Sequence, residues 1–142
     1  MLEKKIINIA VHGVGTIGKR HLMAMNENQN VNLSGIIDIS DEAKQFCDNK
    51  NIPIYENLID LRKKSEIDGV IISTPTIFHY ENTLAALELG LDVLIEKPIS
   101  ADVLEARTIA KVAEENNCKV LVGHQRRFYP LVRKAKEIVK NG

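Results

Sequence analysis

Five short runs rich in Ile and Val, separated by segments with helical periodicity, constrain the fold of this chain more than any other feature. The runs are "IINIAV" (6–11), "VNLSGIID" (31–38), "GVIIST" (69–74), "DVLIE" (92–96) and "KVLVG" (119–123). Apolar runs of this kind suit strands that are covered on both faces, and strands that alternate with helices form a parallel sheet. We therefore predict an α/β fold, a doubly wound and mainly parallel sheet with helices on both faces.

The segments between these runs predict the helices. Two of them repeat apolar residues at helical spacing, the first at Ile77, Tyr80, Leu84 and Leu87 and the second at Val103, Ala106, Ala110 and Ala113. Gly90 is suited to the left-handed position that ends a helix, and Ser100 is placed to cap the first turn of the next one. Further helices are expected at 16–27, after Asp41, at 57–64, and from Pro130 as a first helical residue.

Composition predicts one soluble domain, residues 1–142, with no nucleic-acid or membrane partner. Apolar residues make up 44% of the chain, and 19 basic residues balance 19 acidic ones. The basic residues that follow Gln125 outnumber Glu137, the one acid there, as is typical of a solvated helix face. The two cysteines are far apart and no signal peptide precedes the first run, so we expect a cytoplasmic protein.

The sequence "VHGVGTIGKRH" places Gly13, Gly15 and Gly18 in a G-x-G-x-x-G pattern between the first run and the first expected helix. In such a pattern the first glycine makes a tight turn, the second lets the backbone approach a pyrophosphate, and the third lets the helix pack close to the strand. Backbone N–H groups at the helix start then face the phosphates. The pattern predicts a dinucleotide site, although glycines in any tight strand-to-helix connection look similar.

Asp38 strengthens this prediction. It ends the run 31–38, twenty residues after Gly18, where a carboxylate can accept hydrogen bonds from an adenosine ribose. The alternative is a helix cap before "DEAKQ". An acid at this position repels a 2'-phosphate, and Ile39 and Ser40 supply no arginine for one, so NAD is favoured over NADP. His12 is expected to be a nearly buried residue, hydrogen-bonded to neighbouring loops, with no catalytic role.

Polar residues also follow the other three runs. The run 69–74 ends in Ser73 and Thr74, and Pro75 and His79 follow it. The run 92–96 ends in Glu96, which Lys97 and Pro98 follow. The run 119–123 is followed by "HQRRFYP". Because ligands bind at the carboxyl ends of parallel strands, we expect these residues to converge on one crevice. The alternative for Glu96 and Lys97 is an ordinary surface salt bridge.

Together these residues resemble the Gfo/Idh/MocA oxidoreductases, whose members include glucose-fructose oxidoreductase and inositol dehydrogenase. The glycine turn, Asp38, "STPTIFH", "EKP" and "GHQRRF" occur in that family's order and at its approximate spacing over nearly the whole chain. The resemblance implies a Rossmann fold and a nicotinamide-dependent dehydrogenase or reductase that acts on a sugar, cyclitol or related polyol. It also implies that the Lys97-Pro98 peptide bond is often cis.

The resemblance also assigns the site residues. It implies that the pyrophosphate lies along Gly13, Thr16 and Ile17 and that the adenosine ribose is held by Asp38. The path towards the nicotinamide would be lined by Ser73, Thr74, Pro75 and His79. The nicotinamide ribose and the reacting carbon would be surrounded by Glu96, Lys97, Gln125 and Arg127. No metal ion is expected.

Lysine suits the chemistry of such a site. Oxidation of a secondary alcohol develops negative charge on its oxygen, and a nearby cation stabilises that charge. Lys97 can donate a hydrogen bond to the oxygen and, if partial burial lowers its pKa, help to move the proton. Glu96 either orients Lys97 or neutralises it as an ion pair.

Members of this family carry a second domain that supplies substrate contacts and through which they generally assemble. We therefore expect a fragment of a longer, homo-oligomeric protein, which binds NAD but has little or no turnover alone, and whose last helix has exposed apolar residues: Leu131, Ala135, Ile138 and Val139.

Two alternatives are kept. The glycine turn also resembles that of glyceraldehyde-3-phosphate dehydrogenases, but neither Cys47 nor Cys118 is placed as the nucleophile which that family needs. The chain could also be a non-catalytic NAD-binding or redox-sensing module.

Overall fold

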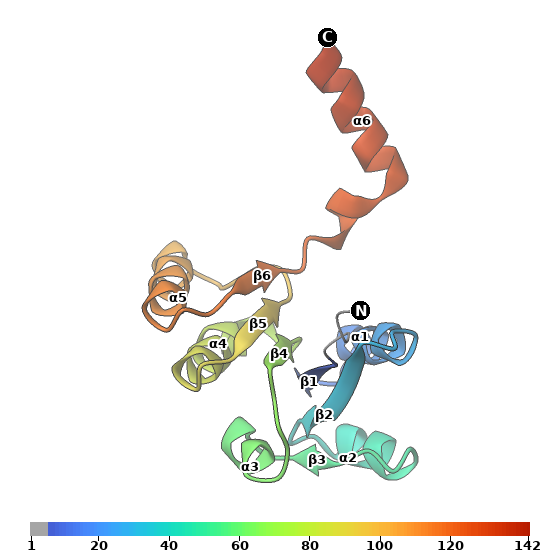
Figure 1. Ribbon diagram of the computed structural model, residues 1–142, viewed down its shortest axis with the longest axis vertical. Helices are drawn as coiled ribbons and strands as arrows, with labels where there is room; N and C mark the ends of the chain where they lie inside the picture. The colour runs from blue at the N-terminus through green and yellow to red at the C-terminus, as the bar shows by residue number, and fades with distance from the viewer. Residues whose placement is uncertain (1–5) are drawn as a thin grey trace, which may run out of the picture.

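The computed structural model describes residues 6–142. Its strands form a six-stranded sheet in the order β3-β2-β1-β4-β5-β6, and every neighbouring pair is parallel (Figure 1). The strands are β1 (Ile7–His12), β2 (Val31–Ile37), β3 (Ile54–Tyr55), β4 (Gly69–Ile72), β5 (Asp92–Ile95) and β6 (Val120–Val122). This is the doubly wound Rossmann arrangement, so the predicted fold class is confirmed. The five predicted runs match five of the strands, and β3 is too short for a periodic pattern to reveal.

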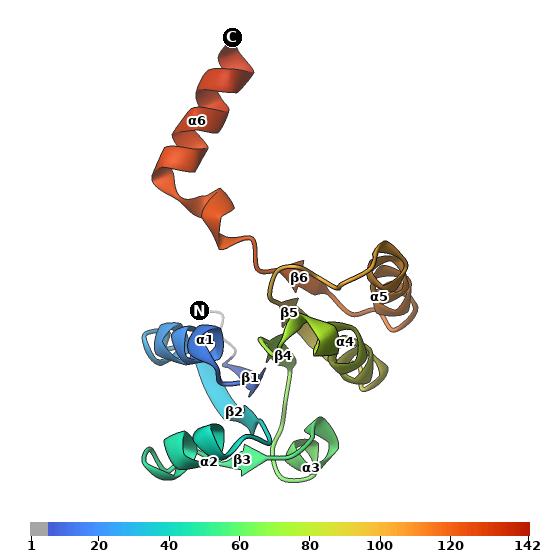
Figure 2. The same cartoon turned by 180° about the vertical axis from the view of Figure 1, so that it is seen from behind.

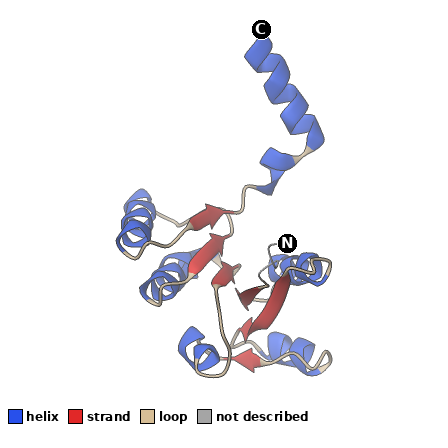
Figure 3. Cartoon of the chain, viewed as in Figure 1, coloured by secondary structure: helices blue, strands red, loops and turns tan. Residues whose placement is uncertain are grey.

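Helices cover both faces of the sheet, as Figures 2 and 3 show. They are α1 (Thr16–Asn26), α2 (Asp41–Asp48), α3 (Leu58–Arg62), α4 (His79–Glu88), α5 (Val103–Glu115) and α6 (Pro130–Asn141), with 3-10 turns η1 (Thr76–Phe78) and η2 (Gln125–Phe128). One apolar cluster joins α1 and α2 to one face of the sheet, and the other joins α3, α4 and α5 to the opposite face. Burial of these clusters is the main source of stability and holds the strand ends in register.

The cap of α5 and the buried faces of α4 and α5 differ from the predictions. Asp102 caps α5, because its carboxylate accepts a hydrogen bond from Leu104 N at 2.6 Å, whereas the Ser100 hydroxyl donates to Asp102 O. Ile77 is 73% exposed, since α4 begins only at His79, and Val103 is 67% exposed at the start of α5. Ala110 is also exposed, whereas Ala113 is buried as predicted and Ile109 is buried beside it on α5. Gly90 does adopt the expected left-handed conformation, with φ +73°.

The last helix, α6, stands away from the sheet (Figures 1 and 2). It begins at Pro130 as predicted, and every one of its residues is exposed. Leu131 is 85% exposed and Val139 83%, so the expectation of uncovered apolar residues on this helix is confirmed. Within residues 6–142, no helix combines the length and apolar character that crossing a membrane requires.

Candidate cofactor-binding and catalytic site

The carboxyl ends of four adjacent strands lie in one row. Gly13, Ser73, Glu96 and Gly123 directly follow β1, β4, β5 and β6. The backbone amide of each donates to a carbonyl of a neighbouring strand at 2.8–2.9 Å, so the row continues the sheet ladder by one residue. The polar residues that follow the predicted runs are therefore brought to the same edge by the sheet itself.

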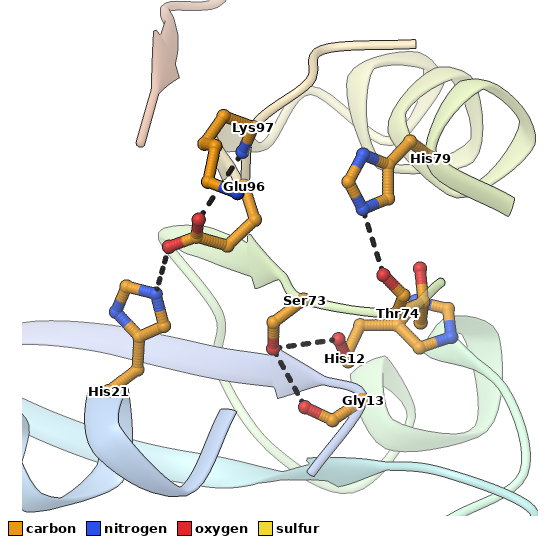
Figure 4. Close-up of polar contacts among 8 residues, drawn as sticks. All are labelled: His12, Gly13, His21, Ser73, Thr74, His79, Glu96 and Lys97. Atoms are coloured by element: carbon orange, nitrogen blue, oxygen red, sulfur yellow. Dashed lines mark hydrogen bonds and ion pairs between the residues drawn. The ribbon is translucent and has the colours of Figure 1, made fainter. Parts of the chain in front are cut away.

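The glycine turn is packed tightly against the end of β4. Gly13 has φ +90°, and a Cβ on it would lie 2.7 Å from Thr74 N. The Ser73 hydroxyl donates to Gly13 O at 2.7 Å and fixes the turn (Figure 4). A Cβ on Gly18 would collide with the same Gly13 carbonyl. Gly15 is different, because a Cβ there would meet nothing within 4 Å, so its backbone is open to a ligand.

The N-terminus of α1 is left without a cap. Gly15 is its N-cap residue, supplies no side-chain hydrogen bond, and no acidic residue occupies the first turn. The helices α2, α3 and α5, in contrast, each have a side-chain cap and an acid in the first turn. The free N–H groups and the positive end of the α1 dipole therefore suit an anion such as a pyrophosphate. Thr16 is exposed and Ile17 half-buried at this end.

Asp38 joins the glycine turn to the turn after β2. Its Oδ2 accepts from Val14 N at 2.9 Å, and its Oδ1 accepts from Ser40 N at 2.9 Å and from the Ser40 hydroxyl at 2.8 Å. Burial acts to raise the pKa of Asp38, but these hydrogen bonds together outweigh it and hold the pKa below its usual value. The cap of α2 is Ser40, which accepts from Ala43 N, so the alternative of Asp38 as the cap is wrong.

Burial shifts the pKa of His12 and of both cysteines. The His12 ring makes no hydrogen bond to any residue of 6–142, so the expected bonds to neighbouring loops are absent. Burial lowers its pKa to about 4, against the opposing charge of Asp38. Burial also raises the pKa of the Cys47 and Cys118 thiols, which makes both poor nucleophiles.

Glu96 and Lys97 do not pair with each other through their side chains. Glu96 is buried, at 8% exposure, whereas Lys97 is exposed and its ammonium group forms no ion pair within residues 6–142. The Glu96 Oε2 accepts instead from the backbone Lys97 N at 3.3 Å, and its Oε1 accepts from His21 Nε2 at 2.9 Å (Figure 4). The alternative of a surface salt bridge is therefore wrong, and so is the partial burial invoked for Lys97. The Lys97-Pro98 bond is cis, as the resemblance implies.

His21 is the residue that sequence reasoning missed. It lies in α1, three residues after Gly18, whose position against Gly13 shows that this face of the helix meets the sheet. Residues three apart share a helix face, so the signal was present in "GKRH". Its partner Glu96 is 75 residues away in sequence, and no local pattern names it.

His79 is a buried histidine at the start of α4. Only 1% of it is exposed, and its Nδ1 and Nε2 lie 2.8 Å from Pro98 O and from Thr74 O. His79 thus ties the turn after β4 to the turn after β5, and Figure 4 shows its contact with Thr74. His79 and Glu96 are both buried and hydrogen-bonded within the chain, and their expected contacts with the cofactor stay predictions.

Gln125 and Arg127 follow the end of β6 by a few residues. Both lie in η2, all of whose residues are exposed, and η2 leads away from the sheet to α6 (Figure 1). Pro75 is exposed at the start of η1, beside Thr74. Among residues 6–142, no group of three or more side chains is arranged to bind a metal ion.

The model of the GFO_IDH_MocA oxidoreductase family, described as an NAD-binding Rossmann fold, matches residues 7–124. This chain belongs to the Gfo/Idh/MocA family. A similar curated Gfo/Idh/MocA relative is the rhizopine catabolism protein MocA of Rhizobium meliloti, 30% identical over 130 residues, which cover 92% of this chain and 41% of that protein.

Solved Gfo/Idh/MocA structures match the whole arrangement. The myo-inositol 2-dehydrogenase of Lactobacillus plantarum has a TM-score of 0.87 at 33% identity, covering 97% of this chain and 42% of that one. The scyllo-inositol dehydrogenase of Lactobacillus casei, solved with NAD(H) and scyllo-inositol, has a TM-score of 0.85 at 29% identity, with 97% and 42% covered. The chain thus spans about two fifths of the length of these proteins.

NAD is the cofactor of this family, and the residues present fit it. The glycine turn leaves open space only at Gly15, the α1 N-terminus is uncapped, and the Asp38 carboxylate lies between the glycine turn and α2. The expected cofactor and family are confirmed, and the contacts of individual residues with NAD stay predictions.

Proposed function

We propose that this chain is the nucleotide-binding part of a longer dehydrogenase, which transfers a hydride between NAD(H) and a secondary alcohol or ketone of a sugar, cyclitol or related polyol. The observation that carries the proposal is the position of Lys97. Lys97 is exposed and forms no ion pair within residues 6–142. It directly follows Glu96, which lies in the same row of strand ends as the glycine turn.

An unpaired ammonium group at this edge can act on a substrate oxygen. When bound, NAD supplies the acceptor for the hydride. Oxidation also releases the hydroxyl proton, which would pass to solvent at this exposed edge, while Lys97 donates a hydrogen bond to the oxygen and stabilises the negative charge that develops on it. Because Glu96 binds the main chain of Lys97 and not its ammonium group, no residue of 6–142 neutralises the charge of Lys97.

The substrate class is inferred from the relatives. The names of two structural neighbours specify inositols as substrates, and their secondary hydroxyl groups suit the chemistry of Lys97. The relatives are longer than this chain. The residues that select the substrate, and those that join the subunits of a homo-oligomer, would lie in that additional length. The 142-residue chain alone is expected to bind NAD with little or no turnover.

Replacement of Lys97 tests this function. In the full-length protein that the gene encodes, Lys97→Met should lower kcat for NAD-dependent polyol oxidation by at least about 100-fold, since the group that stabilises the developing charge is lost. NAD affinity should change little. Turnover is measured from the formation of NADH with a panel of inositols and sugars.

The matched control is Lys111→Met, which removes another exposed lysine, on α5. It should leave kcat unchanged. Normal turnover of the Lys97→Met protein would contradict the catalytic role of Lys97, and robust dehydrogenase activity of the 142-residue chain would contradict its assignment as part of a site.

A further inference from the structure

The turn that carries Lys97 is held from two sides by histidines of two different helices. His21 of α1 contacts Glu96 on one side (Figure 4), and His79 of α4 contacts Pro98 O on the other. His79 is buried at 1% exposure and also contacts Thr74 O, so it belongs to the packing of the fold. His21 is the more exposed of the two, and its only described side-chain contact is with Glu96.

The Glu96 carboxylate has little freedom to move. A Cβ added to Gly123 would lie 2.9 Å from Glu96 Oε1 and 3.0 Å from its Cδ, so the carboxylate packs directly on the end of β6. A buried carboxylate is stable only when donors satisfy it. Within residues 6–142, the donors are His21 Nε2 and the backbone Lys97 N. Among the side chains of residues 6–142, His21 is therefore the one that hydrogen-bonds this carboxylate.

The same helix presents its N-terminus to the proposed pyrophosphate. His21 lies on α1, whose uncapped start is at Thr16, and Glu96 binds the main chain of Lys97. Hydrogen bonds thus connect the helix that would receive the phosphates to the residue that would meet the substrate oxygen. Because a displacement of about 1 Å can cost up to about 100-fold in rate, a fixed connection of this kind matters for catalysis.

We propose that His21 is a positioning residue, which orients Glu96 and thereby fixes the main chain of Lys97 relative to the phosphate-binding end of α1. The inference rests on the proposed function for its catalytic consequence. Its structural part, the dependence of Lys97 on His21, can be measured on the 142-residue chain without any turnover.

Two amide variants separate positioning from general packing. In His21→Gln, the side-chain nitrogen is as many bonds from Cβ as His Nε2 and can still donate to Glu96, whereas in His21→Asn it is one bond shorter and cannot reach. The probe is the backbone amide of Lys97 in the NMR spectrum of the chain. Its chemical shift and its hydrogen-exchange protection should change in His21→Asn and return towards the unsubstituted values in His21→Gln.

Steady-state kinetics of the full-length protein supply the second readout. There, His21→Asn should lower kcat by about 10- to 100-fold with the KM for NAD within about two-fold, and His21→Gln should recover most of the rate. A positioning role would be overturned by a Lys97 amide that is unmoved in His21→Asn, or by equal losses in the Asn and Gln variants. The unsubstituted full-length protein could also be inactive while the Lys97 amide responds to the His21 variants as expected. That result would contradict the proposed function but would still support His21 as the residue that positions Lys97.

Discussion

At the end of β1, the imidazole of His12 lies partly buried and within the field of the Asp38 carboxylate. Burial lowers its pKa from 6.5 to about 4, despite the favourable charge of Asp38. The folded chain therefore keeps His12 neutral at pH values where the unfolded chain protonates it. Stability from this residue is fully present above pH 6.5 and is lost as the pH falls from 6.5 towards 4.

We expect acidification to unfold the unsubstituted chain more readily than a His12→Phe variant, whose ring does not titrate. Between about pH 7 and pH 5, the free energy of unfolding should fall by about 2 kcal/mol more in the unsubstituted chain, from the linkage of one such group. Urea unfolding at both pH values measures the difference, and titration of the carboxylates cancels between the two proteins. Equal losses in both would mean that His12 is not kept neutral by burial.

At the scale of the elements, the strand-turn-helix unit around β1 and α1 separates packing from ligand contact. Gly18 faces the backbone of Gly13, where a Cβ cannot fit, and Gly15 faces open space. Gly15 also has φ −63°, a backbone angle that alanine adopts without strain. Two glycines of one motif therefore have different physical reasons to be glycine.

Substitution of each glycine by alanine should give opposite results. Gly18→Ala should lower the free energy of unfolding by about 1 to 3 kcal/mol, because backbone must shift to admit the methyl group. Gly15→Ala should leave it within about 0.5 kcal/mol but weaken NAD binding, since its methyl group enters the space proposed for the pyrophosphate. Thermal unfolding and calorimetric titration measure the two effects. NAD binding undiminished in Gly15→Ala would place the pyrophosphate elsewhere.

These elements also show what the sequence can predict. Gly13, Gly18, Gly90 and the strand ends follow from local rules of backbone geometry and periodicity, and the structure agrees with them. The cap at Asp102 was missed because the first residue of α5 depends on where the preceding turn ends. The contact of His21 with Glu96 was missed because it depends on how α1 rotates against the sheet.

At the scale of the whole molecule, the site is one-sided. The glycine turn, Asp38 and Lys97 lie along the carboxyl edge of the sheet, while Gln125 and Arg127 lead away from it towards α6. The helix α6 exposes large apolar residues such as Leu131 and Val139. Large apolar residues exposed together on one helix are typical of an interaction surface. It agrees with the proposal that the rest of a longer protein completes the site.

The central claim is that the glycine turn, the uncapped start of α1 and Asp38 form an NAD site. Isothermal titration of the 142-residue chain with NAD, and separately with NADP, tests it most directly. We predict that NAD binds with a measurable heat and that NADP binds at least about 10-fold more weakly, because Asp38 repels a 2'-phosphate. An absence of binding at millimolar NAD, or equal affinity for the two cofactors, would contradict the claim.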